Sequence, residues 1–322
     1  MKKNNLNAII LAAGKGARMK SDQLKVVHQV AGKPIINYVV DVVDQMGAVT
    51  IYLVVGHQAE AVKKVIKNPK VTYVNQAQQL GTGHAVMQVA SHIKGDNNQN
   101  ILVLAGDCPL LQLKTLKGMV AVHHKENAAV TVLTVNMDNP GMYGRIIREE
   151  NGVVKGIKEA RECRRQELEI TEINTGAYIF NQKLLFEYLK NIDSGNKQGE
   201  YYLTDLLHIL KSAGHRVSAY CMANEEEAVG VNTRRDLAQI NKVLYQHNNQ
   251  KMMDKGVTII DTHTTFIGSE VSIGKDTIIE PFTVIDGNTK IGSRCVVGAY
   301  SYIKNGKIAK ETTLTPYTII KE

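Results

Sequence analysis

The end of the chain carries an apolar residue at every sixth position. The series holds one register up to Ile303 and resumes after a one-residue slip at Ile308. Its members are Ile267, Ile273, Ile279, Ile285, Ile291, Val297, Ile303, Ile308, Leu314 and Ile320. A six-residue period, with glycine after several of these positions, is typical of a left-handed parallel β-helix, in which each triangular coil takes three hexapeptides. The ten positions therefore predict about three coils over residues 257–322.

The first part of the chain alternates strand-like and helix-like runs. Between residues 5 and 135 the strand-like runs are short, rich in β-branched residues and apolar on both faces, as buried parallel strands are. They are NAIILAA, VTIYLVV, KVTYV, NILVLAGD and AAVTVLTV, and amphipathic stretches such as KPIINYVVDVVDQM lie between them. The alternation predicts an α/β fold with a doubly wound, Rossmann-like sheet, in which ligands bind beyond the carboxyl ends of the strands.

From about residue 143 the pattern changes. YGRIIREENGVVKGIKEA alternates on both sides of an EENG turn, which predicts a β-hairpin, and QGEYYLTDLLHILKSAG predicts a helix that Gly214 closes. We expect this half to fold back over the sheet and cover the substrate. The amphipathic stretch 233–256 predicts a helix that links a domain at 1–232 to the β-helix at 257–322.

Composition narrows the class of protein. The chain has 322 residues, 43% of them hydrophobic, which is enough to bury a core in two domains. Its net charge of +8 comes from dispersed cations with few aromatic residues beside them, which favours local phosphate binding over a nucleic-acid partner. No apolar run is long enough to span a membrane, the start is a poor signal peptide, and the four cysteines form no CxxC pair. We therefore expect a cytoplasmic protein that binds neither nucleic acid nor membrane.

A glycine loop follows the first predicted strand, in LAAGKGARMKSDQLKVVH. It lacks the Walker frame, and a dinucleotide fingerprint would need glycine where Met19 stands. What remains is Gly14-x-Gly16 followed by Arg18, in which backbone N–H groups and a guanidinium can close on phosphate oxygens. Lys25 adds a point charge on a later turn. Taken alone, the stretch is also compatible with an ordinary turn between strand and helix that carries surface cations.

The glycine loop resembles the signature of sugar-phosphate nucleotidylyltransferases. QAQQLGTGHAV, GDCPLL, YGRI, EINTGAYIF, QGEYYLTDLL and GVNTR then follow in the order found in the bacterial N-acetylglucosamine-1-phosphate uridylyltransferases, and the resemblance covers essentially the whole chain. It implies Mg²⁺-dependent transfer of UMP from UTP to N-acetylglucosamine 1-phosphate. The products would be pyrophosphate and UDP-N-acetylglucosamine, a peptidoglycan precursor. The family is trimeric, which implies a homotrimer assembled through the β-helix.

The resemblance also implies a role for individual residues. Nucleotide binding falls on Leu11, Ala12, Ala13, Gly14, Gln76, Gly81, Thr82 and Gly106. Sugar binding falls on Gly144, Glu159, Asn174 and Asn232. Arg18 and Lys25 would stabilise charge on the α-phosphate and on pyrophosphate. A glutamine amide both donates and accepts hydrogen bonds, which suits the edge of uracil, although Gln76 in isolation reads as a solvated residue at a strand end.

Asp107 and Asn232 are the metal ligands that the resemblance implies. Mg²⁺ prefers oxygen ligands and needs only one or two protein groups beside phosphates. The alternatives are structural: Asp107 as a turn or helix cap before Pro109, and Asn232 as the N-cap of the following helix.

Some features depart from the family pattern. The sugar-binding Glu159 is followed by Ala160, where the family often continues with HKDA-like residues. Gln78 stands where a glutamate is common, and Ala105 replaces a larger residue. The later motifs for acetyl-CoA and the amino sugar are absent. We therefore expect no acetyltransferase activity. Two other functions stay open: a glucose-1-phosphate uridylyl- or thymidylyltransferase, and a non-catalytic protein that binds nucleotide sugars.

Overall fold

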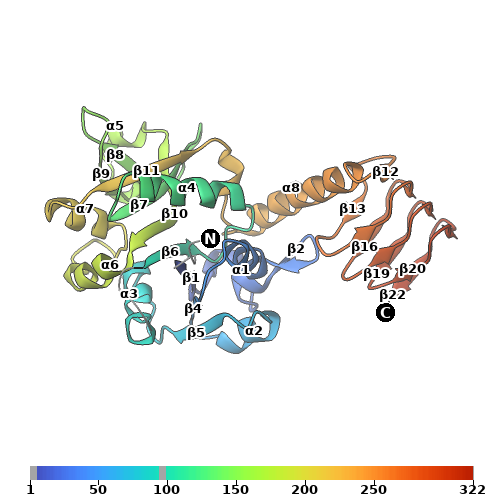
Figure 1. Cartoon of the computed structure of the whole chain (residues 1–322), viewed down its shortest axis with the longest axis horizontal. Helices are drawn as coiled ribbons and strands as arrows, with labels where there is room; N and C mark the ends of the chain where they lie inside the picture. The colour runs from blue at the N-terminus through green and yellow to red at the C-terminus, as the bar shows by residue number, and fades with distance from the viewer. Residues whose placement is uncertain (1–5, 94–98, 322) are drawn as a thin grey trace. The chain divides into compact units, whose positions relative to one another are not determined.

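The computed structural model describes residues 6–93 and 99–321, which divide into two compact units. The first unit contains the chain up to Val27 together with Ile36–Gly230. The second contains His28–Ile35 and the chain from Val231 onward (Figure 1). The short segment His28–Ile35 thus belongs to a different unit from the residues that precede and follow it in the chain. The domain limits at residues 232 and 256 stay a prediction.

The first unit is built on a mixed sheet with the strand order β11-β7-β10-β6-β1-β4-β5. In chain order these strands are β1 (Leu6–Ala12), β4 (Ile51–Val55), β5 (Val71–Asn75), β6 (Asn100–Ala105), β7 (Val130–Asn136), β10 (Glu172–Asn181) and β11 (Val217–Met222). The five strand-like runs of the sequence are β1, β4, β5, β6 and β7, as predicted. The sheet is not wholly parallel, however, because β10 runs antiparallel between β6 and β7.

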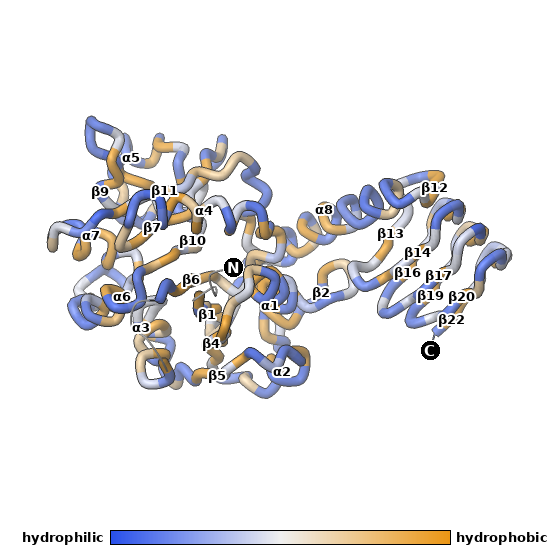
Figure 2. The backbone as a smooth tube through the Cα atoms, in the orientation of Figure 1, coloured by the Kyte–Doolittle hydropathy of each residue, from blue (hydrophilic) through white to orange (hydrophobic). Residues whose placement is uncertain are grey.

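The sheet is buried on both faces. Successive residues of β1 alternate between two apolar clusters, with Ala8 and Ile10 in one and Ile9 in the other. Figure 2 shows the strands of this sheet as largely hydrophobic. The helices of the unit are α1 (Ile35–Gln45), α2 (Ala59–Val65), α3 (Thr82–Met87), α4 (Leu113–Lys125), α5 (Arg165–Leu168), α6 (Gln182–Tyr188) and α7 (Asp205–Ser212). None of the helices described in either unit combines the length and apolar character needed to cross a membrane.

The predicted hairpin is present. It consists of β8 (Arg145–Arg148) and β9 (Val154–Lys158), which pair antiparallel, and β8 joins β10 through the pairing of Arg145 with Ile173. The helix predicted after it begins at Asp205, later than the sequence pattern suggests, and Gly214 follows its end at a φ of +84°. The hairpin therefore connects residues near 144 and 159 to the central sheet.

The second unit contains a long helix and a parallel β-helix. The helix α8 (Arg234–Met253) begins with a capping box in which Thr233 accepts from the backbone N–H of Asp236. A two-stranded hairpin, β2 (Gln29–Val30) and β3 (Lys33–Pro34), also belongs to this unit. The β-helix consists of three all-parallel sheets. Their strands are β12 (Thr258–Ile259), β15 (Ile278–Ile279), β18 (Val296–Val297) and β21 (Thr313–Leu314); β13 (Phe266–Ile267), β16 (Val284–Asp286), β19 (Tyr302–Lys304) and β22 (Ile319–Lys321); and β14 (Ser272–Ile273), β17 (Lys290–Ile291) and β20 (Lys307–Ile308).

The apolar series of the sequence forms the core of this β-helix. Ile267, Ile285, Ile303 and Ile320 pair in register along one sheet, and the first three are fully buried. Ile285 lies 18 positions after Ile267, whereas Ile320 lies 17 after Ile303, so the slip shortens one turn without moving any apolar residue off the core. The predicted coils are confirmed.

Small polar residues two positions before these apolar residues were not singled out by the pattern. Thr283, Thr289 and Ser301 are buried, and each donates to the backbone carbonyl three residues earlier, at 2.6–2.8 Å. Each hydroxyl thus supplies a hydrogen bond to a backbone carbonyl at a corner of the coil, where the buried side chain is removed from solvent water.

Candidate active site

A cavity of about 390 Å³ opens in the first unit where β1 and β6 end. Most of the predicted site residues line it: Leu11, Ala12, Ala13, Gly14, Lys25, Gln76, Gly81, Thr82, Asp107, Glu159 and Asn174. Two larger hollows lie elsewhere on the surface. The one of about 490 Å³ is lined by none of the predicted residues, and the one of about 610 Å³ is lined by Gln76 alone among them. The smaller cavity is therefore the candidate active site. Arg18, Gly106, Gly144 and Asn232 lie outside its lining.

The glycine loop leaves β1 at the floor of this cavity. Gly14 is exposed, and a Cβ built on it would meet no atom within 4 Å, so its backbone is open to a ligand. Gly16 has a φ of +63°, and a Cβ there would approach the Lys25 Cβ to 2.8 Å. Glycine at position 16 thus lets the loop close over the stem of Lys25. Arg18 lies on an exposed turn of 3-10 helix, Ala17–Met19, beyond the lining.

Lys25 and Asp107 form an ion pair. Lys25 begins a second 3-10 turn (Lys25–Val27), and Asp107 lies two residues after β6, so the two side chains come from different loops. Their side chains are only 13% and 18% exposed, which strengthens their attraction relative to a surface pair. The Cys108 thiol donates to the other Asp107 oxygen, Oδ1, at 3.5 Å, and burial together with Asp107 raises the pKa of that thiol.

Gln76 is buried and orders the loop that follows it. Its backbone N–H donates to Val55, and its Nε2 donates to the carbonyl of Gly81 at 3.1 Å. Gly81 needs glycine, because its φ is +108° and a Cβ would lie 2.6 Å from the carbonyl oxygen of Tyr201. Thr82 accepts from the backbone N–H of Leu203 at 3.1 Å. These bonds hold the LGTG loop against the segment that precedes α7.

Gly106 has a structural position beneath the cavity. Its N–H donates to the carbonyl of Leu11 at 2.9 Å, and a Cβ at Gly106 would lie only 2.9 Å from the same oxygen. Glycine here allows the end of β1 and the turn before Asp107 to meet, which brings the glycine loop and the carboxylate together.

Three residues predicted to bind sugar converge on the hairpin side of the cavity. The backbone N–H of Asn174 donates to the carbonyl of Gly144 at 2.9 Å, and a Cβ on Gly144 would lie 3.6 Å from Glu159 Oε1. Glu159 accepts a long hydrogen bond, 3.5 Å, from the Thr204 hydroxyl. Burial raises the pKa of the Glu159 carboxyl and Glu162 adds to it. A partly buried carboxylate with one hydroxyl donor still has acceptor capacity for sugar hydroxyls.

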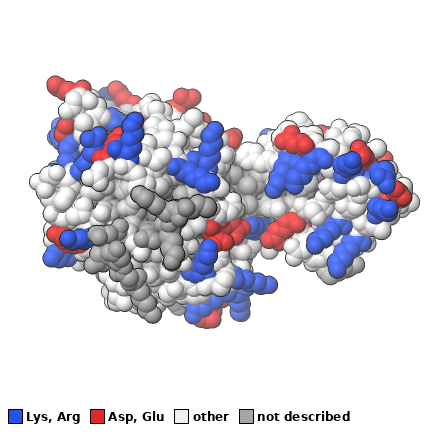
Figure 3. All heavy atoms as spheres, in the orientation of Figure 1, with Lys and Arg blue, Asp and Glu red and all other residues white. Residues whose placement is uncertain are grey.

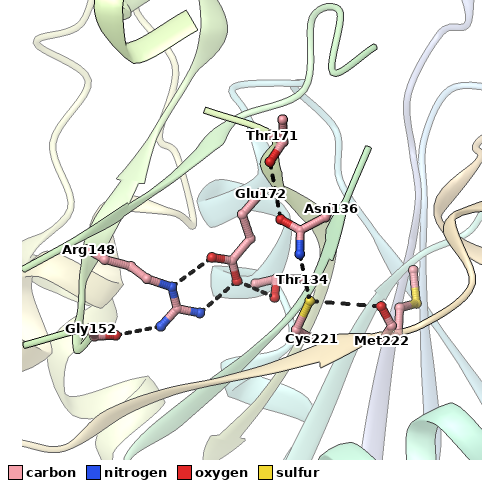
Figure 4. Close-up of polar contacts among 8 residues, drawn as sticks. All are labelled: Thr134, Asn136, Arg148, Gly152, Thr171, Glu172, Cys221 and Met222. Carbon is pink, nitrogen blue, oxygen red and sulfur yellow. Dashed lines mark hydrogen bonds and ion pairs between the residues drawn. The ribbon is translucent and has the colours of Figure 1, made fainter. Parts of the chain in front are cut away.

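A hydrogen-bond network fixes the hairpin relative to β10 (Figure 4). Arg148 grips Glu172 with two nitrogens, each 2.7 Å from a carboxylate oxygen, and also donates to the carbonyl of Gly152. Thr134 on β7 donates to the same carboxylate at 2.7 Å. Burial acts to raise the pKa of Glu172, but the hydrogen bonds from Arg148 and Thr134 prevail and lower it. The network joins β7, β8 and β10, the framework on which Asn174 is carried.

The cavity offers an oxygen donor to a divalent cation. Among the residues that the structure describes, no three His, Cys, Asp or Glu side chains gather as a metal cage. Asp107, one of the carboxylates that line the cavity, is the kind of donor that Mg²⁺ accepts when phosphate oxygens complete its shell. The first unit ends at Gly230, where a Cβ would lie 3.4 Å from Asp107 Oδ1, and Asn232 follows two residues later. The Asp107 carboxylate by itself fits a cation that is bound together with a nucleotide.

Asn232 itself belongs to the second unit. The alternative that it caps α8 is wrong, because Thr233 occupies the N-cap position, while the Asn232 backbone N–H donates to Asp236. The sharing of a metal by Asp107 and Asn232 remains a prediction.

Four polar residues line the cavity that the sequence motifs did not single out. They are Gln79, Tyr178, Glu200 and Thr204. Glu200 and Thr204 fall inside QGEYYLTDLL, and Tyr178 falls inside EINTGAYIF, so the motifs contained them without indicating which side chains face the site. Tyr201 and Tyr202, expected to form core or cleft wall, lie outside the lining and are partly buried.

Known proteins resemble the chain in both units. The family described as "Nucleotidyl transferase" matches residues 7–249, and that described as "Bacterial transferase hexapeptide (six repeats)" matches residues 270–305. The second match agrees with a left-handed parallel β-helix.

Several relatives carry the name "Bifunctional protein GlmU". That of Clostridium botulinum is 44% identical over 313 residues, which cover 97% of this chain and 68% of the relative. That of Enterococcus faecalis is 46% identical over 310 residues, covering 96% and 67%, and that of Latilactobacillus sakei is 46% identical over 315 residues, covering 98% and 68%. The chain thus spans about two thirds of the length of these relatives.

Proposed function

Because the chain belongs to the nucleotidyl transferase family, as a relative of the GlmU proteins, we propose that it transfers UMP from UTP to N-acetylglucosamine 1-phosphate. The products are UDP-N-acetylglucosamine and pyrophosphate. One observation carries the proposal beyond family membership. A single cavity is lined by a phosphate-type glycine loop, the Lys25–Asp107 pair, Gln76, and the sugar-type residues Glu159 and Asn174.

The reaction needs positioning and charge neutralisation rather than a general base. A sugar phosphate is already ionised near neutral pH, and its oxygen attacks the α-phosphorus of UTP in line with the departing pyrophosphate. Lys25 stabilises charge that develops on the phosphates, and its ion pair with Asp107 holds it at the cavity beforehand. Arg18, on the exposed turn of the glycine loop, is proposed to close on the phosphates of bound UTP.

The two ends of the cavity are proposed to take the two substrates. The backbone of Leu11–Gly14, with Gln76, Gly81, Thr82 and Gly106, holds UTP. Gly144, Glu159, Asn174 and Asn232 hold the sugar. The Nε2 of Gln76 is directed at Gly81 and His84, so its contact with uracil is through the amide oxygen or follows a rearrangement of that loop.

Asp107 and Asn232 are the residues proposed to hold Mg²⁺. When bound, the ion neutralises charge on the phosphates that meet in the reaction. Lys25 must exchange Asp107 for phosphate when substrates enter, because one carboxylate oxygen now accepts from the lysine.

A pyrophosphate-release assay over a panel of sugar phosphates and nucleotides tests the proposal. Turnover should be highest with UTP and N-acetylglucosamine 1-phosphate and should require a divalent cation. A preference for glucose 1-phosphate or for dTTP would show that the proposed substrates are wrong. Absence of pyrophosphate release with every pair of substrates would indicate a non-catalytic protein that binds nucleotide sugars. Acetyl-CoA consumption with glucosamine 1-phosphate tests the expected lack of acetyl transfer, which stays a prediction.

A homotrimer formed through the β-helix is part of the proposal. Its support is an exposed aromatic ladder, in which Phe282 stacks on Tyr300 at 4.8 Å between ring centroids and Tyr300 on Tyr317 at 5.1 Å. A stacked row of exposed rings is a surface that a second copy of the chain can cover. Light scattering tests the assembly.

Lys and Arg are scattered among Asp and Glu over the face drawn in Figure 3, which supports small phosphorylated substrates over nucleic acid. The cytoplasmic location stays a prediction.

A further inference from the structure

The phenol of Tyr178 is buried beside the residues proposed to bind sugar. Tyr178 lies on β10 and is 4% exposed, and its ring packs 5.8 Å from that of Phe180. It nonetheless lines the cavity, and Asn174 Nδ2 donates to its hydroxyl at 2.7 Å. A polar group in this position has a function beyond filling the core, because phenylalanine would fill the same space without a hydroxyl to satisfy.

An irregularity in β10 brings these two side chains together. Asn174 pairs with Thr134 and Tyr178 with Val132, so four steps along β10 match two along β7, and the excess forms a bulge. Gly176 lies in the bulge with a φ of +79°, a conformation that favours glycine. In a regular strand, residues four apart lie about 13 Å from each other, too far for this hydrogen bond. The bulge therefore places Tyr178 next to Asn174.

The bulge also determines which way the Asn174 amide faces. The backbone N–H of Gly176 donates to Asn174 Oδ1 at 3.0 Å, and a backbone N–H is always a donor. The amide oxygen must therefore face Gly176, which leaves the Nδ2 group for Tyr178. With one N–H given to Tyr178, the second N–H and one lone pair of the amide remain for a ligand.

The Tyr178 hydroxyl accepts from Asn174, so its own proton is left to donate to a different acceptor. Burial raises the pKa of the phenol, and although the Asn174 bond lowers it, the group stays protonated at neutral pH. The phenol is thus a neutral donor in a cavity that otherwise presents the acidic Glu159 on the sugar side.

We propose that Tyr178 is a positioning residue for the sugar phosphate, which holds the Asn174 amide in one orientation together with the backbone of Gly176 and directs a hydroxyl proton at an oxygen of the N-acetylated sugar. The inference rests on the proposed function, because it assigns the same end of the cavity to the sugar. The proposal assigns Tyr178 a role in discriminating between sugars and no role in binding the nucleotide.

The test is steady-state kinetics of Tyr178→Phe with both substrates varied. Loss of one neutral hydrogen bond, with the Asn174 N–H left unpaired, should raise KM for N-acetylglucosamine 1-phosphate about 5- to 20-fold. KM for UTP should stay within about twofold, and the preference for the N-acetylated sugar over glucose 1-phosphate should fall. Tyr188→Phe is the matched control, because its hydroxyl bonds to His215 outside the cavity lining. It should leave both KM values unchanged.

A double-mutant cycle separates positioning from simple packing. Because Tyr178 is proposed to hold Asn174 as well as to contact the sugar, the loss of sugar binding in the variant with both Tyr178→Phe and Asn174→Ala should be smaller than the sum of the two single losses. Additive losses would overturn the inference. Calorimetric binding of UDP-N-acetylglucosamine to each variant gives the same comparison without turnover. Tyr178→Met, which keeps apolar bulk, replaces Tyr178→Phe if the latter does not fold.

The outcomes distinguish this inference from the function on which it rests. A wild-type enzyme that does not use N-acetylglucosamine 1-phosphate overturns the proposed function. An active wild type with an unchanged KM for the sugar phosphate in Tyr178→Phe overturns only the role of Tyr178. Equal losses for UTP and the sugar phosphate would also overturn it, because they would show a general structural effect.

Discussion

Lys25 and Asp107 form an ion pair at the edge of the sheet although 82 positions separate them in the chain. The pair places the proposed phosphate-binding cation against the proposed metal-binding carboxylate. Each charge is thereby compensated before substrates arrive, and each is preorganised for a partner that the substrates supply. The cost of burying either group alone is avoided as well.

Replacing Lys25 with alanine should lower kcat by about 10²- to 10³-fold, the effect of removing one preorganised electrostatic group. The same change leaves Asp107 without its cation, so metal binding in the absence of nucleotide should become tighter. Stopped-flow or coupled pyrophosphate assays measure the first effect, and titration with Mn²⁺ followed by electron paramagnetic resonance measures the second. Lys20→Ala, an exposed residue of the same loop, is the control and should behave as wild type. Near wild-type turnover of Lys25→Ala would contradict the proposed role.

Glu159→Gln should raise the thermal stability of the protein and weaken its binding of the sugar phosphate. Burial and Glu162 raise the pKa of Glu159 above its ordinary 4.5, so the ionised carboxylate is disfavoured in the folded state at pH 7. The amide removes this effect, and the melting temperature should rise by about 1–3 °C at pH 7. Because the wild-type group regains its proton as pH falls, the difference should vanish below about pH 4.5. KM for the sugar phosphate should rise at the same time.

Differential scanning calorimetry between pH 4 and 8 measures the stability of this variant, and the exposed Glu169→Gln serves as control. A melting temperature that falls at pH 7 would show that the carboxylate is stabilised by partners in the fold. In that case Glu159 would be a structural group.

The sequence predicted the elements of the fold better than their arrangement. The spacing of Ile267 and its successors determined the coils of the β-helix, since a six-residue period allows few other structures. The position of β10 between β6 and β7 could not be predicted, because strand order depends on tertiary packing. EINTGAYIF also interrupts the apolar pattern with Asn174, Thr175 and Gly176, the residues that form its bulge.

The candidate site shows the same division. Residue types and motifs indicated Lys25, Asp107, Glu159 and Asn174, and all four line one cavity. Their pairings were beyond the sequence. The bond of Lys25 to Asp107 depends on where two loops meet, and the contact of Tyr178 with Asn174 depends on a bulge that removes the regular strand spacing.

Breaking the network around Glu172 should weaken the first unit in a pH-dependent way. The hydrogen bonds from Arg148 and Thr134 outweigh burial and lower the pKa of Glu172 below its ordinary 4.5. A lowered carboxyl pKa stabilises the fold above the unfolded-state value, and the contribution disappears as pH falls through the folded-state value. Glu172→Gln should therefore cost about 1–2 kcal/mol of unfolding free energy at pH 7 and progressively less below pH 4.5.

Urea unfolding at several pH values measures this effect. Glu60→Gln is the control, since Glu60 pairs with Lys63 on the exposed surface and should contribute little. A Glu172→Gln penalty that is constant from pH 7 to pH 3 would mean that the carboxylate acts by packing and not by its charge.

Two adjacent isoleucines of β15 allow the core of the β-helix to be tested with an internal control. Ile279 is fully buried and pairs with Val297, whereas Ile278 precedes it on the same strand and is 38% exposed. Ile279→Ala should destabilise the second unit by about 2–4 kcal/mol, because it removes buried apolar surface and leaves a cavity between coils. Ile278→Ala should cost far less in the isolated chain. Denaturant unfolding followed by circular dichroism measures both. If Ile278→Ala proves as costly as Ile279→Ala and the loss depends on protein concentration, the outward face of β15 is buried between copies of the chain, as the proposed trimer requires.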